Sequence, residues 1–369
     1  MLLSCILWSF FAATPEMDWA IRETEIYQPL QAGEVIVSPK GETLVLNFAG
    51  SLITRFSADG QKLNTIGFKG RGPGGLTYPM VFFLEGNVVY VQDLIDSTIN
   101  AFQLDGQFIQ KVRCPKRNIQ LAKVEGGWIY GQWQAGPEQS PERAVYWSDL
   151  NFENPKSLLN IETMGEQGGL NMQVSDGEVK AVFTPVSSAP LLAYAPDHSR
   201  IYIAEAQGFK IYVIDGKSGQ LLSTIIRQDR SIPFDEAWGD ARLENLKEMM
   251  AAQGHQAKVE KNYPSHFPIV RAMKVLPDGT LVVDRWRGNP EENHWTIAFG
   301  PDGKERPSAP DWTSAERIVG RIDQWLIVTT FEDEEAGLSR CKPEDLDAFL
   351  KAHPIDYDGP LGRRISLEN

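Results

Sequence analysis

The stretch that decides the fold is Gly86–Ile109, GNVVYVQDLIDSTINAFQLDGQFI. It contains a β-rich run that ends at Asp93, a short polar turn, a second β-run over Thr98–Phe102, and an Asp105-Gly106 turn that leads into a third run. Asp-Gly between alternating apolar runs is a strong hairpin signal. The stretch therefore predicts three antiparallel strands joined by tight turns.

The same unit recurs along the chain. Gly41–Leu63, GETLVLNFAGSLITRFSADGQKL, aligns with it without a gap, because Asn47 lies nine residues before Phe56 as Asp93 lies nine before Phe102. Weaker or longer copies follow at Gly127–Gln132 with Ala144–Trp147, Ser199–Glu205 with Lys210–Ile214, Pro277–Asp284 with Trp295–Phe299, and Arg321–Thr330 with Gly337–Arg340. A period of ~40–50 residues with three or four strands in each unit is typical of propeller blades.

We therefore predict an all-β protein, a six-bladed β-propeller that forms one domain over residues 15–369. A β-sandwich is the competing architecture, but its strands would not recur with matched polar ends. Phe234–Ala257 breaks the β-pattern with an amphipathic helical pattern, which predicts a helical insertion at about 234–257 between blades four and five. Glu344–Ala352 predicts a short C-terminal helix after Pro343.

The N-terminus predicts export. Residues 1–14 hold an uncharged apolar run followed by small residues, as in a signal peptide, although no Lys or Arg precedes the run. An apolar N-terminal strand is the alternative, and Leu2-Leu3-Ser4-Cys5 resembles a lipobox, so a lipid anchor is a further alternative. The expected location is periplasmic or extracellular. The apolar run is too short to span a membrane, and no later segment approaches that length.

Composition excludes some partners. The 369 residues carry 36 Lys and Arg against 49 Asp and Glu, a formal net charge of −13. Such a surface repels phosphate, so we expect no nucleic acid and no anionic membrane as a partner. After Cys5, only Cys114 and Cys341 remain, and no Cys/His cluster with zinc spacing occurs.

The repeat suggests a ring of polar side chains. Alignment places Asn47, Asp93, Gln132, Glu205 and Asp284 at one equivalent strand end, with Thr329 or Thr330 in the sixth copy. Oxygen ligands that converge on one channel rim suit a hard cation, so Ca²⁺ is the candidate cofactor, held by Asn47, Asp93, Glu205 and Asp284. The same residues could instead supply a carboxyl group with a raised pKa for acid–base catalysis, or each could cap its own turn.

Three other features are candidate ligand contacts. Arg71 lies in the Gly70–Gly75 loop, which could face an anion or simply connect two blades through glycines with positive φ. Asp284-Arg285-Trp286-Arg287 offers arginine and indole groups to an acidic or sugar-like ligand, or else forms Arg–Asp pairs at the surface with Trp286 packed between blades. His266 enters the fifth copy and could serve a ligand or the structure.

A family resemblance follows from these motifs. Val89–Asp93 with Thr98–Phe102 and Asp105-Gly106 resembles the NHL-type repeat. Lys69–Leu76 is similar to a Gly-Arg-Gly-Pro-Gly-Glu-Phe stretch of bacterial exported six-bladed propellers, with Gly75 and Leu76 in place of Glu and Phe. Pro264–Val283 is similar to a later part of those proteins. The resemblance implies an extracytoplasmic propeller and no single activity.

The sequence predicts a binding or scaffold module without assigned catalysis, with a small-molecule or protein ligand at one propeller face. The alternative is a metal-dependent lactonase, lyase or hydrolase with its site at the channel. Known propeller lactonases use a Glu near the first strand, for which Glu34 and Glu42 are the candidates here. A third possibility is a protein-interaction propeller that uses the helical insertion.

Overall fold

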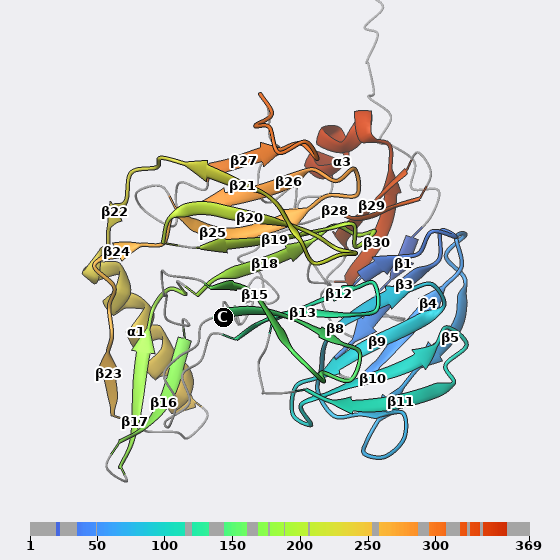
Figure 1. Cartoon of the computed structure of the whole chain (residues 1–369), viewed down its shortest axis with the longest axis horizontal. Helices are drawn as coiled ribbons and strands as arrows, with labels where there is room; N and C mark the ends of the chain where they lie inside the picture. Colours follow the sequence, from blue (N-terminus) through green and yellow to red (C-terminus); the bar gives the residue numbers. More distant parts are fainter. Residues whose placement is uncertain are drawn as a thin grey trace, which may run out of the picture.

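The chain folds as a six-bladed β-propeller in a computed structural model (Figure 1). The structure describes residues 20–22, 35–48, 50–114, 120–132, 144–160, 169–175, 178–187, 189–205, 207–252, 258–286, 295–307, 318–322, 325–332 and 335–352. The predicted signal peptide, residues 1–14, lies outside this part of the chain. The predicted fold class is confirmed.

Blades one to five are antiparallel sheets whose strands lie side by side in sequence order. Blade one contains β2 (Val35–Val37), β3 (Thr43–Asn47), β4 (Leu52–Phe56) and β5 (Lys62–Ile66); blade two contains β8 (Pro79–Glu85), β9 (Val88–Asp93), β10 (Thr98–Gln103) and β11 (Phe108–Arg113); blade three contains β12 (Gln120–Val124), β13 (Gly127–Gln132), β14 (Ala144–Asp149) and β15 (Lys156–Asn160). Blade four contains β18 (Leu191–Tyr194), β19 (Arg200–Glu205), β20 (Phe209–Asp215) and β21 (Leu221–Arg227), and blade five contains β25 (Val270–Val275), β26 (Leu281–Arg285) and β27 (Trp295–Phe299).

The sixth blade joins the two ends of the chain. It contains β28 (Ile318–Ile322), β29 (Trp325–Glu332) and β30 (Glu335–Cys341), and its outermost strand is β1 (Ala20–Arg22), which pairs antiparallel with β30. Backbone hydrogen bonds therefore close the ring. The sequence repeat did not reveal this closure, because β1 is only three residues long.

Two segments inserted between blades lie outside the ring of six sheets. The first is the hairpin of β16 (Gly169–Ser175) and β17 (Glu178–Thr184), between blades three and four. The second, between blades four and five, holds β22 (Ile232–Pro233), α1 (Glu236–Ala252), β23 (Val259–Lys261) and β24 (His266–Phe267). β23 pairs parallel with β17, so the two insertions meet at one side of the molecule, away from blades one and two (Figure 1). The helical insertion was predicted at this place, and the hairpin was not.

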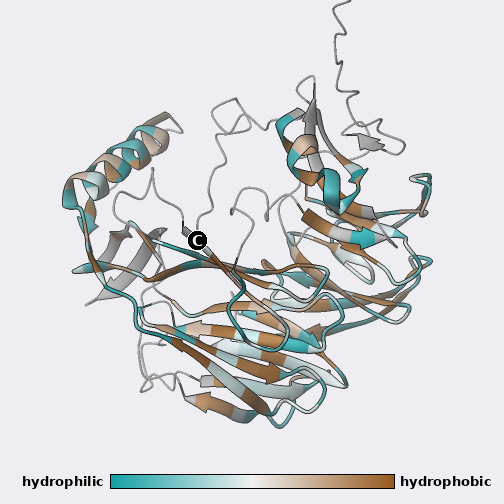
Figure 2. Cartoon of the chain, turned by 90° about the horizontal axis from the view of Figure 1, so that it is seen from above, coloured by the Kyte–Doolittle hydropathy of each residue, from teal (hydrophilic) through white to brown (hydrophobic). Residues whose placement is uncertain are grey.

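The core lies between the blades. Along β9, Val89 and Val91 pack in the cluster shared with blade one, whereas Tyr90 packs in the cluster shared with blade three. The period of two in a strand puts alternate side chains on opposite faces, so each blade buries both faces between its neighbours. Figure 2 shows apolar residues concentrated in the strands, whereas α1 stands at the edge with apolar and polar residues mixed.

Two shorter features complete the chain. β6 (Phe68–Lys69) and β7 (Gly75–Leu76) pair in the connection between blades one and two, and a 3-10 turn (Pro343–Asp345) leads into α3 (Leu346–Ala352), where a terminal helix was predicted. Cys114 and Cys341 are buried and not bonded to each other, and burial raises the pKa of the Cys114 thiol to about 12. Within the described part of the chain, no helix combines the length and the hydropathy that crossing a bilayer requires.

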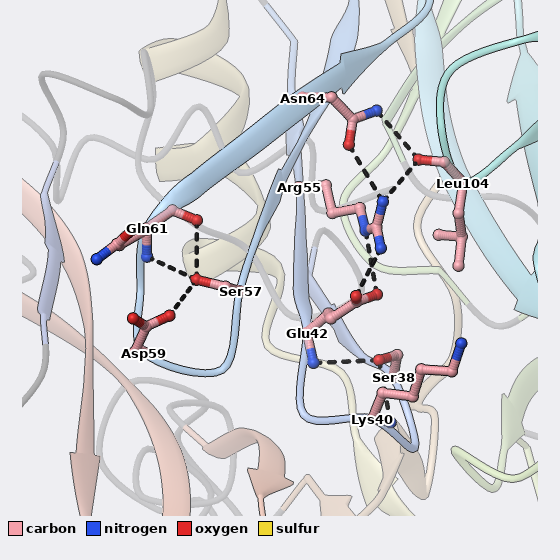
Figure 3. A network of polar contacts seen from close by, with 9 residues as sticks. All are labelled: Ser38, Lys40, Glu42, Arg55, Ser57, Asp59, Gln61, Asn64 and Leu104. Carbon is pink, nitrogen blue, oxygen red and sulfur yellow. Dashed lines mark hydrogen bonds and ion pairs between the residues drawn. The ribbon is translucent and has the colours of Figure 1, made fainter.

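A polar network ties blade one to blade two (Figure 3). The Arg55 guanidinium donates to both carboxylate oxygens of Glu42, at 3.0 Å and 2.5 Å, and its Nη1 donates to the carbonyl oxygen of Leu104 at 3.3 Å. Asn64 Nδ2 donates to the same carbonyl oxygen at 3.0 Å. Because Leu104 lies in the turn after β10, this network fixes the outer parts of two blades to each other.

The network generates a stability prediction. Arg55→Ala leaves the partly buried Glu42 carboxylate without its bidentate partner, so we expect a loss of about 2–4 kcal/mol in the free energy of unfolding. Urea unfolding of Arg55→Ala, Glu42→Gln and the double variant measures the coupling, which should be about 1–3 kcal/mol. The exposed Lys62→Ala serves as control and should change stability by less than about 0.5 kcal/mol. Additive single losses would contradict the account.

Candidate functional site

The predicted polar strand ends occupy matching positions. Asn47, Asp93, Gln132 and Glu205 end the second strands of blades one to four, and Asp284 is the penultimate residue of β26 in blade five. Each lies next to the turn that leads to the third strand of its blade. The side chains of Gln132, Thr329 and Thr330 lie outside the described residues.

Asp93 is fully buried and accepts three backbone hydrogen bonds. The N–H groups of Thr77 and Tyr78, in the connection from blade one, donate to it at 2.5 Å and 3.2 Å. The N–H of Asp96, in the following turn, donates at 3.3 Å. One carboxylate thus fixes both the connection between two blades and the turn after its own strand.

Asn47 and Glu205 also have local partners. Asn47 Oδ1 accepts from the N–H of Gly50 at 2.7 Å, which is a cap of its own turn. Glu205 Oε1 accepts from the hydroxyl of Tyr212 at 2.5 Å and lies 3.3 Å from Lys210 Nζ, both on the neighbouring strand β20. Burial, with Glu205 beside it, raises the pKa of the Tyr212 hydroxyl, so this hydroxyl remains a donor.

Asp284 forms a different kind of contact. Its fully buried carboxylate pairs with Arg271 Nε of β25 at 2.5 Å. The neighbouring Arg285 is also buried and pairs through Nη1 with Asp229 at 2.5 Å. This segment therefore forms Arg–Asp pairs, but Asp284 and Arg285 are buried, whereas the sequence led us to expect such pairs at the surface. Arg287 lies outside the described residues.

These contacts bear on the predicted cation site, which stays a prediction. At least one side-chain oxygen of each of Asn47, Asp93, Glu205 and Asp284 already accepts a hydrogen bond from the chain or pairs with one of its cations. Among the described residues, no group of three or more His, Cys, Asp or Glu side chains is placed to hold a metal ion. Glu42, the candidate from the first strands, is held bidentately by Arg55, and Glu34 lies outside the described residues.

Arg71 and His266 are both exposed and lie in different parts of the fold. Gly70, Gly72 and Gly74, around Arg71, have φ of 149°, 113° and 79°, as expected for a connection that needs glycine. The N–H groups of Gly70 and Gly75 donate to carbonyl oxygens of the same loop, so they are not presented to an anion. His266 lies in β24, and its Nδ1 is 3.0 Å from Ser265 Oγ.

The structure brings together an aromatic cluster that the sequence did not single out as a unit. It consists of Phe234, Trp238, Tyr263, Phe267 and Trp286. The Phe267 ring lies 4.8 Å from that of Phe234 and stacks on Trp286 at 5.2 Å, and the two indoles are 6.0 Å apart. Because Trp238 belongs to α1 and Trp286 follows β26, the cluster attaches the helix to blade five.

Charged groups surround the aromatic cluster. Arg242 lies 4.9 Å from the centre of the Trp238 ring, and Arg271 lies 5.7 Å from that of Trp286. The Tyr263 hydroxyl donates to Asp240 of α1 at 2.7 Å, and Lys261 pairs with the same carboxylate. Arginine over an indole face is a favourable cation–π contact. The contacts of Asp240 therefore hold the first two turns of α1 on β23 and the segment after it, and the Trp238–Trp286 contact holds them on blade five.

A second buried group lies where blades two, three and four meet. Lys123 of β12 is 1% exposed and pairs through Nζ with Glu85 Oε2 at 2.8 Å, while its ammonium lies 5.2 Å from the centre of the Tyr90 ring. Burial lowers the pKa of Lys123, although the Glu85 carboxylate favours the charged form. The burial of Lys123 could not be predicted from the sequence, because it depends on how the blades pack against one another.

His198 links blade four to blade two through a hydrogen bond. Its Nε2 donates to the carbonyl oxygen of Leu84 at 3.2 Å, and its ring stacks on Tyr194 at 5.7 Å. The buried Nδ1 has no hydrogen-bond partner in the described structure. Burial lowers the pKa of His198 and the charge of Lys123 lowers it further, while the carbonyl of Leu84 and the carboxylates of Glu85 and Asp197 oppose the shift.

The fold can be compared with that of known proteins. A candidate exported protein from Bacteroides fragilis has a TM-score of 0.50 at 12% identity, over 85% of this chain and 91% of that chain. A DUF4221 member from Bacteroides vulgatus has a TM-score of 0.46 at 10% identity, over 88% of this chain and 96% of that chain. Virginiamycin B lyase from Staphylococcus aureus has a TM-score of 0.41 at 13% identity, over 87% and 98% of the two chains.

The first of these structures supports the propeller fold and nothing finer. No family model matches the chain, and no curated protein matches it. The function must therefore be argued from the chain's own residues.

His198 makes stability depend on pH. Its pKa is lowered in the folded state, so the unfolded chain takes up a proton first as the pH falls below the ordinary value of 6.5. The free energy of unfolding should then decrease with falling pH, by at most about 1.4 kcal/mol per pH unit. Urea unfolding at several pH values should show a weaker dependence in His198→Asn, whose side chain tolerates the positive φ of 56°.

The exposed His266→Asn is the matched control and should keep the dependence of the wild type. An equal pH dependence in His198→Asn and the wild type would contradict this assignment. The comparison is made within each protein across pH, so an overall loss of stability in the variant does not affect it.

Proposed function

We propose that the chain is an exported propeller that serves as a non-catalytic binding or scaffold module. Its recognition surface is the outward face of α1, together with the aromatic cluster that holds this helix on blade five. The observation that carries the proposal is the attachment of α1 through its first two turns, while the rest of the helix remains largely exposed.

The exposure of α1 supports this proposal. Only Gly239 and Leu243 of its 17 residues are buried, and the Met249 side chain is 45% exposed. A helix of this length gains little from intrinsic propensity and needs packing to form. Here the aromatic cluster supplies the packing at one end and holds the helix in place for a partner. Trp, Tyr and Arg, the residues of the attachment, are also those enriched in binding hot spots.

The contacts at the polar strand ends support the absence of assigned catalysis. Asp93, Glu205 and Asp284 each have partners within the chain, which accounts for their burial without a substrate or a metal. The alternative is a metal-dependent lactonase, lyase or hydrolase at the channel. It would use the same residues, and no other contact among the described residues supports it. We therefore propose that these residues maintain the fold.

We also propose that the chain is exported and that its repeats are NHL-like. The apolar run within residues 1–14 supports a signal peptide, and the likeness to a candidate exported propeller is compatible with it. The unit Gly86–Ile109 supports an NHL-like repeat. The ligand is a protein or a small molecule, and the exposed helix favours a protein.

The surface can be tested by site-specific photocrosslinking. A photoreactive phenylalanine analogue is placed at Met249 in the full chain, produced in its native cell envelope. We expect a discrete crosslinked product, because Met249 lies on the proposed surface. The matched control places the analogue at Leu63 of β5, which is equally apolar and 48% exposed but lies in blade one.

Trp286→Ala, combined with the analogue at Met249, should reduce the product, because the helix loses part of its attachment. Far-UV circular dichroism confirms that the ring is still folded. No product at Met249, or the same products at both positions, would contradict the proposed surface.

A further inference from the structure

Cations from two separate segments meet at one corner of blade two. The Asp96 carboxylate, in the turn after β9, accepts from Lys111 Nζ of β11 at 2.7 Å. The pKa of the Asp96 carboxyl is lowered, mainly by this hydrogen bond and further by the charge of Arg71, while burial opposes the shift. Arg71 therefore lies near the same carboxylate, although it belongs to the connection between β6 and β7.

The same corner exposes large apolar side chains. Tyr78, just before β8, is 39% exposed, and Ile95, next to Asp96 in the turn, is 48% exposed. The N–H of Leu94 donates to the carbonyl oxygen of Tyr78 at 2.9 Å, so the two segments lie side by side. We call this surface the corner patch, which consists of Arg71, Tyr78, Ile95, Asp96 and Lys111.

Buried contacts hold the corner patch in place. The buried Asp93 carboxylate accepts from the N–H groups of Tyr78 and Asp96, which belong to different segments of the patch. In the connection between β6 and β7, a Cβ on Gly75 would lie 2.6 Å from the carbonyl oxygen of Gly70, so the close packing of this connection requires glycine. A preformed surface of this kind loses little conformational entropy when a partner binds.

The charge around the corner patch differs from that of the whole chain. Residues 35–113, which form blades one and two, hold seven Lys and Arg against six Asp and Glu, a formal charge of +1, so the remainder carries −14. Charges on distant blades are largely screened here, because the Debye length is about 8 Å at physiological ionic strength. In the patch, Arg71 and Lys111 outnumber Asp96, and the exposed Arg113 lies on the same face of β11 as Lys111. The local charge therefore attracts an anionic group.

These features select the kind of occupant. An exposed arginine can donate two parallel hydrogen bonds to a carboxylate, and Tyr and Arg are enriched in binding hot spots. Ile95 is aliphatic and offers no ring on which a sugar could stack, which favours a peptide over a carboxylated polysaccharide. We propose that the corner patch binds a short peptide segment of another protein that carries carboxylates beside apolar side chains.

The corner patch and the helical insertion lie on different sides of the molecule (Figure 1). Binding at the patch is thus an addition to the recognition surface proposed for α1. Neither surface contributes a residue to the other, so either proposal can fail without the other.

Selection from a phage-displayed library of random seven-residue peptides on the immobilised full chain tests this inference. The enriched peptides should carry Asp or Glu next to apolar residues. Synthetic copies of these peptides should bind Arg71→Glu at least about tenfold more weakly than the wild type, as measured by fluorescence polarisation. Ile95→Ser should weaken binding at least about threefold, because apolar contact area is lost.

Two variants match these changes at remote positions. Lys304→Glu makes the same change in charge at a side chain that is 85% exposed after β27, and Ile226→Ser makes the same apolar change at a 70% exposed position of β21. Both should bind the peptides within about twofold of the wild type. Far-UV circular dichroism confirms that each variant is folded.

Three results would overturn the proposal. The first is that no peptide is enriched, or that the enriched peptides lack acidic residues. The second is that they bind Arg71→Glu as tightly as the wild type, as peptides that dock on α1 would. The third is that polygalacturonate, a carboxylated polysaccharide, binds in an Arg71-dependent way while no peptide does.

Discussion

A buried polar side chain at the end of the second strand of a blade is the contact on which this fold depends. A blade is a small sheet that cannot bury both of its faces alone, so each blade must stay against its neighbours. Asp93 shows how this is achieved, since its carboxylate accepts from the connection that brings the chain from blade one and from the turn that follows its own strand. A buried carboxylate is costly unless it is hydrogen-bonded, and here three N–H groups provide the bonds.

The polar strand ends of blades four and five have partners within their own blade. Asp284 uses the guanidinium of Arg271 from the first strand of blade five, and Glu205 uses Tyr212 and Lys210 from its own blade. Arg55 joins blades one and two at a turn after β10, and β1 closes the ring against β30. The helical insertion stands outside this ring, and the proposed recognition surface lies there.

The sequence predicted what is local and periodic. The nine-residue spacing from Asn47 to Phe56 and from Asp93 to Phe102 reflects a hairpin in which neighbouring strands pair directly, so the blades could be found from the sequence. The helix over Glu236–Ala252 followed from its composition, with ends displaced by a few residues from the predicted ones. The β16–β17 hairpin was missed because nothing local separates an inserted hairpin from one that belongs to a blade.

What could not be predicted depends on contacts between distant residues. The donors to Asp93 from Thr77 and Tyr78 lie 16 and 15 positions away, so the sequence could not distinguish a turn cap from a metal ligand. The aromatic cluster joins Phe234 to Trp286 across an insertion, and the enclosure of Lys123 requires three packed blades. Trp286 was a candidate ligand contact, but its stacking on Phe267 appears only in the fold.

We propose that the polar strand ends maintain the ring and do not bind a cation. Isothermal titration of the metal-stripped full chain with Ca²⁺ tests it most directly, with Asp93→Asn as the matched variant. We expect no saturable binding in the wild type and a loss of stability in Asp93→Asn that Ca²⁺ does not change. Stoichiometric Ca²⁺ binding by the wild type that disappears in Asp93→Asn would contradict it.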